Sequence, residues 1–139
     1  MNLQIDESIF RAYDIRGRYP DELNVKTAHL VAEVLAKKIA GSARPFILVG
    51  HDARVSSPAL YHSFIKGLEH TLGKRVRIIS AGLITTPMMY FLANYFGADL
   101  GVAITASHSP KDYNGIKVVG ADNNPISGKQ ILKALHQLK

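Results

Sequence analysis

Three short apolar runs, separated by segments of helical character, constrain this chain more than any other feature of its sequence. They are FILVG at 46–50, VRIIS at 76–80 and LGVAIT within 99–105. Nearly continuous apolar strands are typical of a sheet that is covered on both faces. Strands that alternate with helices through short connections indicate right-handed crossovers. The pattern therefore predicts an α/β fold with a largely parallel sheet.

The helical segments between these runs carry recognisable end signals. Ser57-Pro58 and Thr86-Pro87 each place a capping hydroxyl before a proline at the first helical position. The segment before the first run has apolar residues at helical spacing and closes near Gly41. The predicted helices are residues 24–40, 57–73, 86–95 and a last one after Ser127.

A fourth apolar run, GIKVVG at 115–120, begins only about ten residues after the third. No crossover helix fits in that connection, so we expect this run to pair antiparallel at an edge of the sheet. The fold class predicted is three-layer α/β/α, with a mixed, largely parallel sheet of about four strands and one antiparallel edge strand. The length of 139 residues suits a single domain over 1–139.

The composition of the chain limits the kinds of partner and the cellular location that we expect. The chain has 17 Lys and Arg against 11 Asp and Glu, a formal charge of +6, but the basic residues are scattered and lack aromatic interleaving. We therefore expect no nucleic-acid partner. There is no cysteine, and no apolar run approaches the roughly 18 residues of a membrane span. The N-terminus also lacks a signal region, so we expect a cytoplasmic protein with no membrane partner.

The loop TASHSPKDYNG, after the third apolar run, carries the richest chemistry. Ligands of open α/β sheets bind outside the carboxyl ends of the strands, where this loop emerges. Ser107 could act there as a nucleophile, with His108 and Lys117 as proton-transfer or phosphate-binding groups. The alternative is purely structural, because loop hydroxyls usually satisfy backbone groups and Asn114-Gly115 is a hairpin signal.

Other polar residues have equally simple interpretations. Asp52 and Arg54 can form a local ion pair or cap a turn, and Ser56 and Ser57 can be helix-start residues. FRAYDIRG at 10–17 is too polar for a core strand and is interpreted as an edge strand. From the residues alone, these structural interpretations stay open beside the functional ones.

Metal-ligand spacings were also sought along the chain. Its seven aspartates contain no Asp-x-Asp pair, and no two histidines are three or four residues apart. These spacings predict no self-contained metal site.

Five separated motifs resemble one family of enzymes. They are FRAYDIRG at 10–17, GHDARVSSP at 50–58, GLITTPMMYF at 82–91, ITASHSPKDYNGIKVV at 104–119 and PISG at 125–128. In this order they are similar to the α-D-phosphohexomutases, above all to the bacterial phosphomannomutase/phosphoglucomutase branch. The resemblance covers nearly the whole chain and implies the first domain of a four-domain enzyme.

The resemblance also implies roles for individual residues. Ser107 matches the serine that is phosphorylated and that exchanges its phosphoryl group with a hexose phosphate through a bound bisphosphate. Arg16 and Lys117 match basic positions that bind substrate and stabilise transferred charge, and Lys117 matches a group for proton transfer. His108 matches a histidine that lines the site, and Tyr13 matches a position that faces the sugar. These expectations suit phosphoryl transfer, which depends on positioning and charge neutralisation.

Two departures qualify the resemblance. The family loop usually reads Ser-His-Asn-Pro, whereas Ser109 stands here in place of Asn. The family's Mg²⁺ is held by an aspartate-rich loop of the second domain together with the phosphate on the serine, here Ser107, and those aspartates are absent from this sequence. We therefore expect the chain alone to be inactive and to need the other domains as partners.

The implied enzyme acts on glucose or mannose phosphate, with a hexose 1,6-bisphosphate as intermediate and activator. The alternative function is a non-catalytic module that binds phosphosugars or another protein. If the chain is a separated first domain, we expect an exposed apolar surface around the last helix, with Ile131, Leu132 and Leu135.

Overall fold

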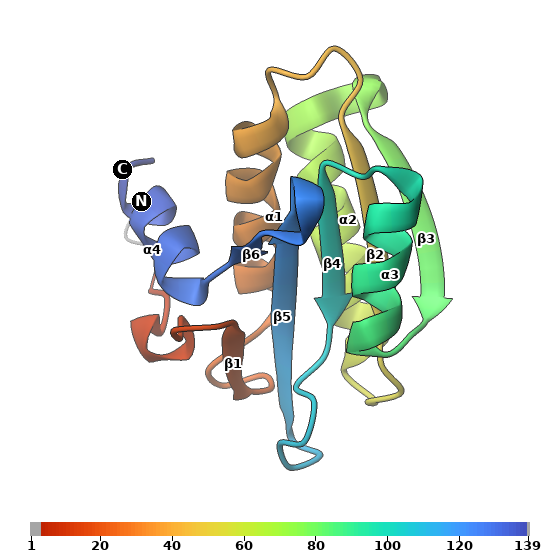
Figure 1. The fold of residues 1–139 in the computed structure, drawn as a ribbon. Coiled ribbons are helices and arrows are strands. Elements are labelled where there is room, and N and C mark those ends of the chain that lie inside the picture. Colours follow the sequence, from red (N-terminus) through yellow and green to blue (C-terminus); the bar gives the residue numbers. More distant parts are fainter. Residues whose placement is uncertain (1–3, 139) are drawn as a thin grey trace.

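The computed structural model describes residues 4–138 and contains a six-stranded mixed sheet (Figure 1). Five strands follow the order β1-β5-β4-β2-β3, and β6 pairs with β5. β2 is parallel to both β3 and β4, whereas β5 is antiparallel to β4, β1 and β6. The strands are β1 (Ile15–Arg18), β2 (Phe46–His51), β3 (Arg77–Leu83), β4 (Leu100–Ile104), β5 (Tyr113–Gly120) and β6 (Pro125–Ile126).

Helices cover both faces of the sheet (Figure 1). The α-helices are α1 (Val25–Ile39), α2 (Ser57–Leu72), α3 (Thr86–Phe96) and α4 (Gly128–His136). Three short 3₁₀ turns are η1 (Glu7–Ile9), η2 (Gly73–Arg75) and η3 (Ala121–Asn123). Among residues 4–138, no helix is both long and apolar enough to span a bilayer. The predicted helices and strands are thus present with small shifts at their ends.

Two apolar clusters define the three layers. The larger joins α1, α2 and α4 to one face of the sheet and includes Leu35, Phe64 and Val102. The smaller lies on the other face and includes Met89 of α3 and Ala103 of β4. Successive residues of a strand point to opposite faces, so β4, buried along its whole length, contributes to both clusters. The predicted three-layer α/β/α class is confirmed.

The position of β5 differs from the sequence-based expectation. β5 pairs antiparallel with β4 as predicted, but it lies inside the sheet because β1 pairs with its other side, Ile15 opposite Ile116. An apolar strand with a free edge would present unpaired backbone groups, and β1 covers them. FRAYDIRG therefore supplies an edge strand, as interpreted from the sequence, and the sheet has six strands rather than about four and one antiparallel edge strand.

The prediction of an exposed apolar surface around the last helix is wrong. Ile131 is 1% exposed and Leu135 is 6% exposed, because both pack into the core beneath α4. Several exposed apolar side chains gather instead on α3, among them Phe91 and Tyr95, whose rings stack at 5.8 Å. Helical spacing alone could not tell which amphipathic helix would be buried.

Candidate active site

Two neighbouring strand ends carry the candidate site. β2 and β4 are parallel, and their register pairs His51 with Ile104 at the carboxyl ends. The backbone N–H of Asp52 donates to the carbonyl of Ile104 (3.0 Å), so the loop after β2 begins against the loop after β4. This is the edge at which open α/β sheets bind ligands.

Ser107 occupies an unusual backbone conformation in the second of these loops. Its φ of 54° lies in the left-handed region, and its side chain is exposed. A non-glycine residue held in this region costs on the order of 1 kcal/mol, which the surroundings must offset. The N–H of Ser107 donates to the hydroxyl of Thr105 (3.0 Å), and its carbonyl accepts from Arg54 (3.1 Å). Both backbone groups of Ser107 are therefore held in place.

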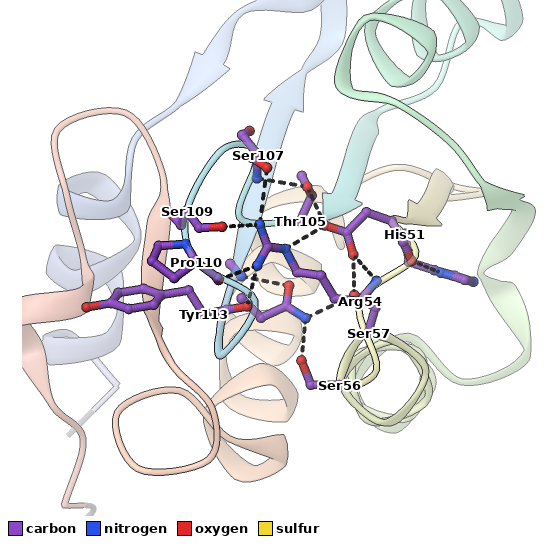
Figure 2. Close-up of polar contacts among 12 residues, drawn as sticks. His51, Arg54, Ser56, Ser57, Thr105, Ser107, Ser109, Pro110 and Tyr113 are labelled. Atoms are coloured by element: carbon purple, nitrogen blue, oxygen red, sulfur yellow. Dashed lines mark hydrogen bonds and ion pairs between the residues drawn. The ribbon is translucent and has the colours of Figure 1, made fainter.

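Arg54 holds the entire loop through its guanidinium (Figure 2). Nη2 donates to the carbonyls of Ser107 (3.1 Å) and Ser109 (2.7 Å). Nη1 donates to those of Pro110 (2.5 Å) and Tyr113 (3.1 Å). Nε donates to Oδ2 of Asp52 (3.1 Å), so all five guanidinium donors are used. The predicted Asp52–Arg54 pair exists, but Arg54 also organises the loop, which the sequence did not reveal.

Asp52 is the anionic centre of this network. Its Oδ1 accepts from the hydroxyl of Ser57 (2.6 Å) and the N–H of Arg54 (3.0 Å), and its Oδ2 accepts from Thr105 (2.7 Å) and Arg54 Nε. Burial alone would raise the pKa of Asp52. The hydrogen bonds from Ser57, Arg54 and Thr105 and the charge of Arg54 outweigh burial, so the pKa is lowered.

This lowered pKa makes a prediction for acid stability. The folded protein binds the Asp52 proton more weakly than the unfolded chain, so the stabilisation is complete above the unfolded pKa of about 3.9 and is lost as pH falls through the lower folded pKa. We expect Asp52→Asn to cost about 2 kcal/mol at neutral pH, because one acceptor becomes a donor facing other donors. Urea unfolding from about pH 7 to about pH 3 should show the difference shrinking at the acid end.

The matched control for this prediction is Asp21→Asn, which alters an exposed aspartate. It should change the free energy of unfolding by less than about 0.5 kcal/mol at either pH. A difference between wild type and Asp52→Asn that stays constant across the pH range would contradict the assigned pKa direction.

Ser57 has a different role from the helix cap that was predicted. It begins α2 and is fully buried, and its hydroxyl donates to Asp52 and accepts from the side-chain amide of Asn114 (2.9 Å). The N-cap position belongs to Ser56, whose hydroxyl also accepts from Asn114 (2.8 Å) and makes no capping bond. Asn114 is completely buried and joins β5 to α2. Asn114 and Gly115 both lie within β5, so the interpretation of this pair as a hairpin turn is wrong.

Arg16 and Lys117 lie on one face of the sheet. Lys117 of β5 is opposite Ala103, which belongs to the apolar cluster on the α3 side of the sheet. Arg16 of β1 is opposite Gly115, which precedes Lys117 by two residues on β5. Residues opposite one another share a face, as do alternate residues of a strand. The two predicted cations are therefore diagonal neighbours beside the start of the Ser107 loop, where the N–H of Thr105 donates to the carbonyl of Gly115 (2.9 Å).

Gly115 permits this close packing of three segments. A Cβ there would lie 2.4 Å from the carbonyl oxygen of Ile15 and 2.6 Å from that of Thr105. Real Cβ atoms do not approach so closely, so any side chain at this position would push β1 and the loop apart.

The guanidinium of Arg16 contacts the loop at Ser109, the residue that stands in place of the family's usual Asn. Its Nη1 donates to the hydroxyl of Ser109 (3.2 Å), and its Nη2 pairs with the buried carboxylate of Asp14 (2.8 Å). Ser109 thus supplies a hydrogen bond of its own in place of the usual Asn. The Nε–H of Arg16 is buried and has no hydrogen-bond partner among residues 4–138.

The remaining predicted site residues project into solvent. His108 is exposed, and Tyr13, just before β1, is 85% exposed. The structure therefore links Ser107, Ser109 and Arg16 through the loop, sets Lys117 beside them, and leaves His108 and Tyr13 at the open surface.

The overall fold matches solved structures of sugar-phosphate mutase proteins. An X-ray structure of a phosphoglucomutase/phosphomannomutase family protein from Burkholderia thailandensis superposes with a TM-score of 0.81 at 30% identity, covering 96% of this chain and 30% of that one. The family profile described as phosphoglucomutase/phosphomannomutase, alpha/beta/alpha domain I, matches residues 7–139. The chain belongs to the phosphoglucomutase/phosphomannomutase family and corresponds to its domain I.

Curated relatives agree with this assignment. The chain is 41% identical over 133 residues to "Phosphomannomutase/phosphoglucomutase" of Pseudomonas syringae, across 96% of this chain and 28% of that protein. It is 36% identical to "Phosphomannomutase" of Vibrio cholerae, across 93% of this chain and 28% of that protein. The chain thus spans about 28% of the length of these relatives. The family predicted from the five motifs is confirmed.

Proposed function

We propose that this chain is the phosphoserine-bearing first domain of a four-domain phosphohexomutase. In this proposal phospho-Ser107 exchanges its phosphoryl group with glucose or mannose phosphate, which interconverts the 1-phosphate and the 6-phosphate. The family assignment supports mutase chemistry, and relatives of the same family carry the names phosphomannomutase and phosphoglucomutase.

One observation carries the assignment of Ser107. It is an exposed serine at the carboxyl edge of the sheet, held at φ 54° by bonds to both its N–H and its carbonyl. A hydroxyl that only completed a turn would need no such support, whereas a group that must meet a phosphorus atom in line benefits from a fixed position. Arg16 and Lys117 beside the loop favour the same role, because they neutralise charge on the transferred group.

The reaction balances as two transfers. In the first, the bond between phosphorus and Ser107 Oγ breaks, a bond forms to the free hydroxyl of the hexose phosphate, and that hydroxyl loses its proton. In the second, the other sugar phosphate bond of the bisphosphate breaks as its phosphorus bonds to Ser107 Oγ, and the released sugar oxygen takes up the proton. We assign Lys117 to proton transfer and to phosphate binding, Arg16 to phosphate binding, His108 to the site wall and Tyr13 to the sugar.

The residues described here do not form a complete Mg²⁺ site in the loop. The nearby carboxylates are already engaged, Asp52 by four hydrogen bonds and Asp14 by the ion pair with Arg16. A phosphate on Ser107 would offer one oxygen ligand, whereas Mg²⁺ prefers near-octahedral oxygen coordination. We therefore derive no step from Mg²⁺ on these residues and assign the other ligands to the second domain, which makes the chain alone inactive.

The alternative is a module that binds a phosphosugar without reacting. The cationic guanidinium of Arg16 beside the loop would serve such a module equally well. The strained backbone of Ser107 favours the catalytic assignment, because binding alone does not require a serine in the left-handed region.

Mapping the phosphate tests the assignment. The protein that carries this domain would be incubated with a hexose 1,6-bisphosphate, quenched and digested, and the phosphorylated peptide sequenced by mass spectrometry. We expect the phosphate on Ser107, and the modification should disappear in Ser107→Ala but persist in the neighbouring control Ser109→Ala. Phosphate on Ser109 or on another residue would contradict the proposal.

A further inference from the structure

Two histidines and a glutamate meet across the α1–α2 interface, away from the Ser107 loop. His29 and Glu33 are one turn apart on α1, and Nε2 of His29 lies 3.1 Å from Oε1 of Glu33. His70 of α2 places its Nδ1 2.5 Å from the same oxygen. The three potential ligand atoms all lie within 4.8 Å of one another.

The packing of the two helices brings these side chains together. A Cβ at Gly67 would lie 2.4 Å from the carbonyl oxygen of His29, so only glycine allows α2 to approach α1 this closely. The hydroxyl of Ser63, one turn earlier on α2, donates to the carbonyl of Val25 (2.5 Å). The two helices thus lie side by side on one face of the sheet (Figure 1), and His70, about one turn beyond Gly67, reaches Glu33.

Two of the three residues are partly withdrawn from solvent. The side chains of Glu33 and His29 are 20% and 34% exposed, whereas that of His70 is 73% exposed. The imidazole rings of His29 and His70 have centroids 5.8 Å apart. The less exposed pair comes from α1, and the more exposed third side chain comes from α2.

We propose that His29, Glu33 and His70 bind a divalent transition-metal ion, with Zn²⁺ as the best match. Two imidazole nitrogens and one carboxylate oxygen are a three-ligand set typical of Zn²⁺, with water in the fourth position. Ligand bonds of about 2.0–2.2 Å place neighbouring donor atoms of a tetrahedral site about 3.4 Å apart. The present separations require only small side-chain adjustments, in which the ion replaces the two contacts to Oε1.

This site is separate from any metal near Ser107. Ser57 at the start of α2 belongs to the loop network, whereas His70 lies close to its end. The rise of an α-helix places these positions about 20 Å apart along the axis. An ion on His70 therefore joins α1 to α2 and does not contact a phosphate on Ser107.

Zinc titration of the untagged chain in chelator-free buffer tests the proposal. We expect calorimetry to show one Zn²⁺ per chain, and His70→Ala and Glu33→Gln each to weaken binding at least about tenfold. His62→Ala is the matched control, since His62 is an exposed histidine on the same helix outside the cluster. It should leave the affinity unchanged.

Two further readouts exclude trivial explanations. Because Zn²⁺ would bind the folded chain, saturation should raise the Tm of wild type by about 5–10 °C, and this shift should be lost in Glu33→Gln. Co²⁺ should give visible ligand-field absorption that is absent in His70→Ala. Equal Zn²⁺ affinity in wild type and in both cluster variants, or no saturable binding to wild type, would show that Glu33 only accepts hydrogen bonds from the histidines and would overturn the proposal.

Discussion

Replacing Ser107 with alanine in the protein that carries this domain is expected to lower mutase turnover by at least about a thousandfold. Alanine lacks the oxygen that the proposed mechanism phosphorylates, so no covalent intermediate can form. The loss should appear in kcat with both glucose 1-phosphate and mannose 1-phosphate in the presence of the corresponding bisphosphate. Steady-state assays with each substrate measure it.

A stability measurement separates this effect from a folding defect. The Ser107 side chain is exposed, and the bonds that hold its backbone use only its N–H and carbonyl. Ser107→Ala should therefore change the free energy of unfolding by less than about 0.5 kcal/mol. Ser109→Ala is the neighbouring control and should keep most of the turnover, since it removes only a neutral acceptor from Arg16. Unchanged turnover in Ser107→Ala would remove Ser107 from its proposed role.

The order of strands and helices was predictable because each element carries a strong local signal. The apolar runs at β2 and β4 indicate buried strands, and Ser127 caps α4 as predicted. The cap of α3 is Thr85, however, and the predicted cap Thr86 is the first residue of that helix. The position of β1 in the sheet was harder to predict from the sequence. Its pairing with β5 joins segments almost a hundred residues apart, and a short polar strand has no periodicity that indicates its partner.

The contacts within the site were harder to predict than its location. The sequence identified the Ser107 loop through its hydroxyls and its family motif, but Asp52 and Arg54 looked like a local turn. Their actual role depends on β2 and β4 being neighbours, which brings HDAR against TASH. Polar residues that follow adjacent parallel strands were the available signal.

The His29, Glu33 and His70 cluster was missed for a related reason. Two histidines three or four residues apart are a local signal of a metal site, whereas this cluster takes His29 and Glu33 from α1 and His70 from α2. The absence of a side chain at Gly67 lets the helices approach this closely, and a glycine within a helix has no unique interpretation in a sequence.

Arg54→Lys is expected to have the second largest effect, although it preserves the charge. Lysine has three donors on a single nitrogen and cannot reproduce a planar fork of five. It would release most of the carbonyls of Ser107, Ser109, Pro110 and Tyr113 that Arg54 now binds. We expect a loss of about 3 kcal/mol in the free energy of unfolding of this chain, measured by urea titration.

Arg54→Lys should also slow the proposed phosphoryl transfer. Arg54 is a positioning residue, so Arg54→Lys in the protein that carries this domain should lower kcat about a hundredfold, because Ser107 is no longer fixed for in-line transfer. The KM should change much less. Arg44→Lys is the matched control, since Arg44 is exposed and distant from the loop along the chain, and it should alter neither stability nor kcat. Faster amide exchange at Ser107 in Arg54→Lys alone would identify loop release as the cause, whereas unaltered exchange and kcat would show that Arg54 does not position Ser107.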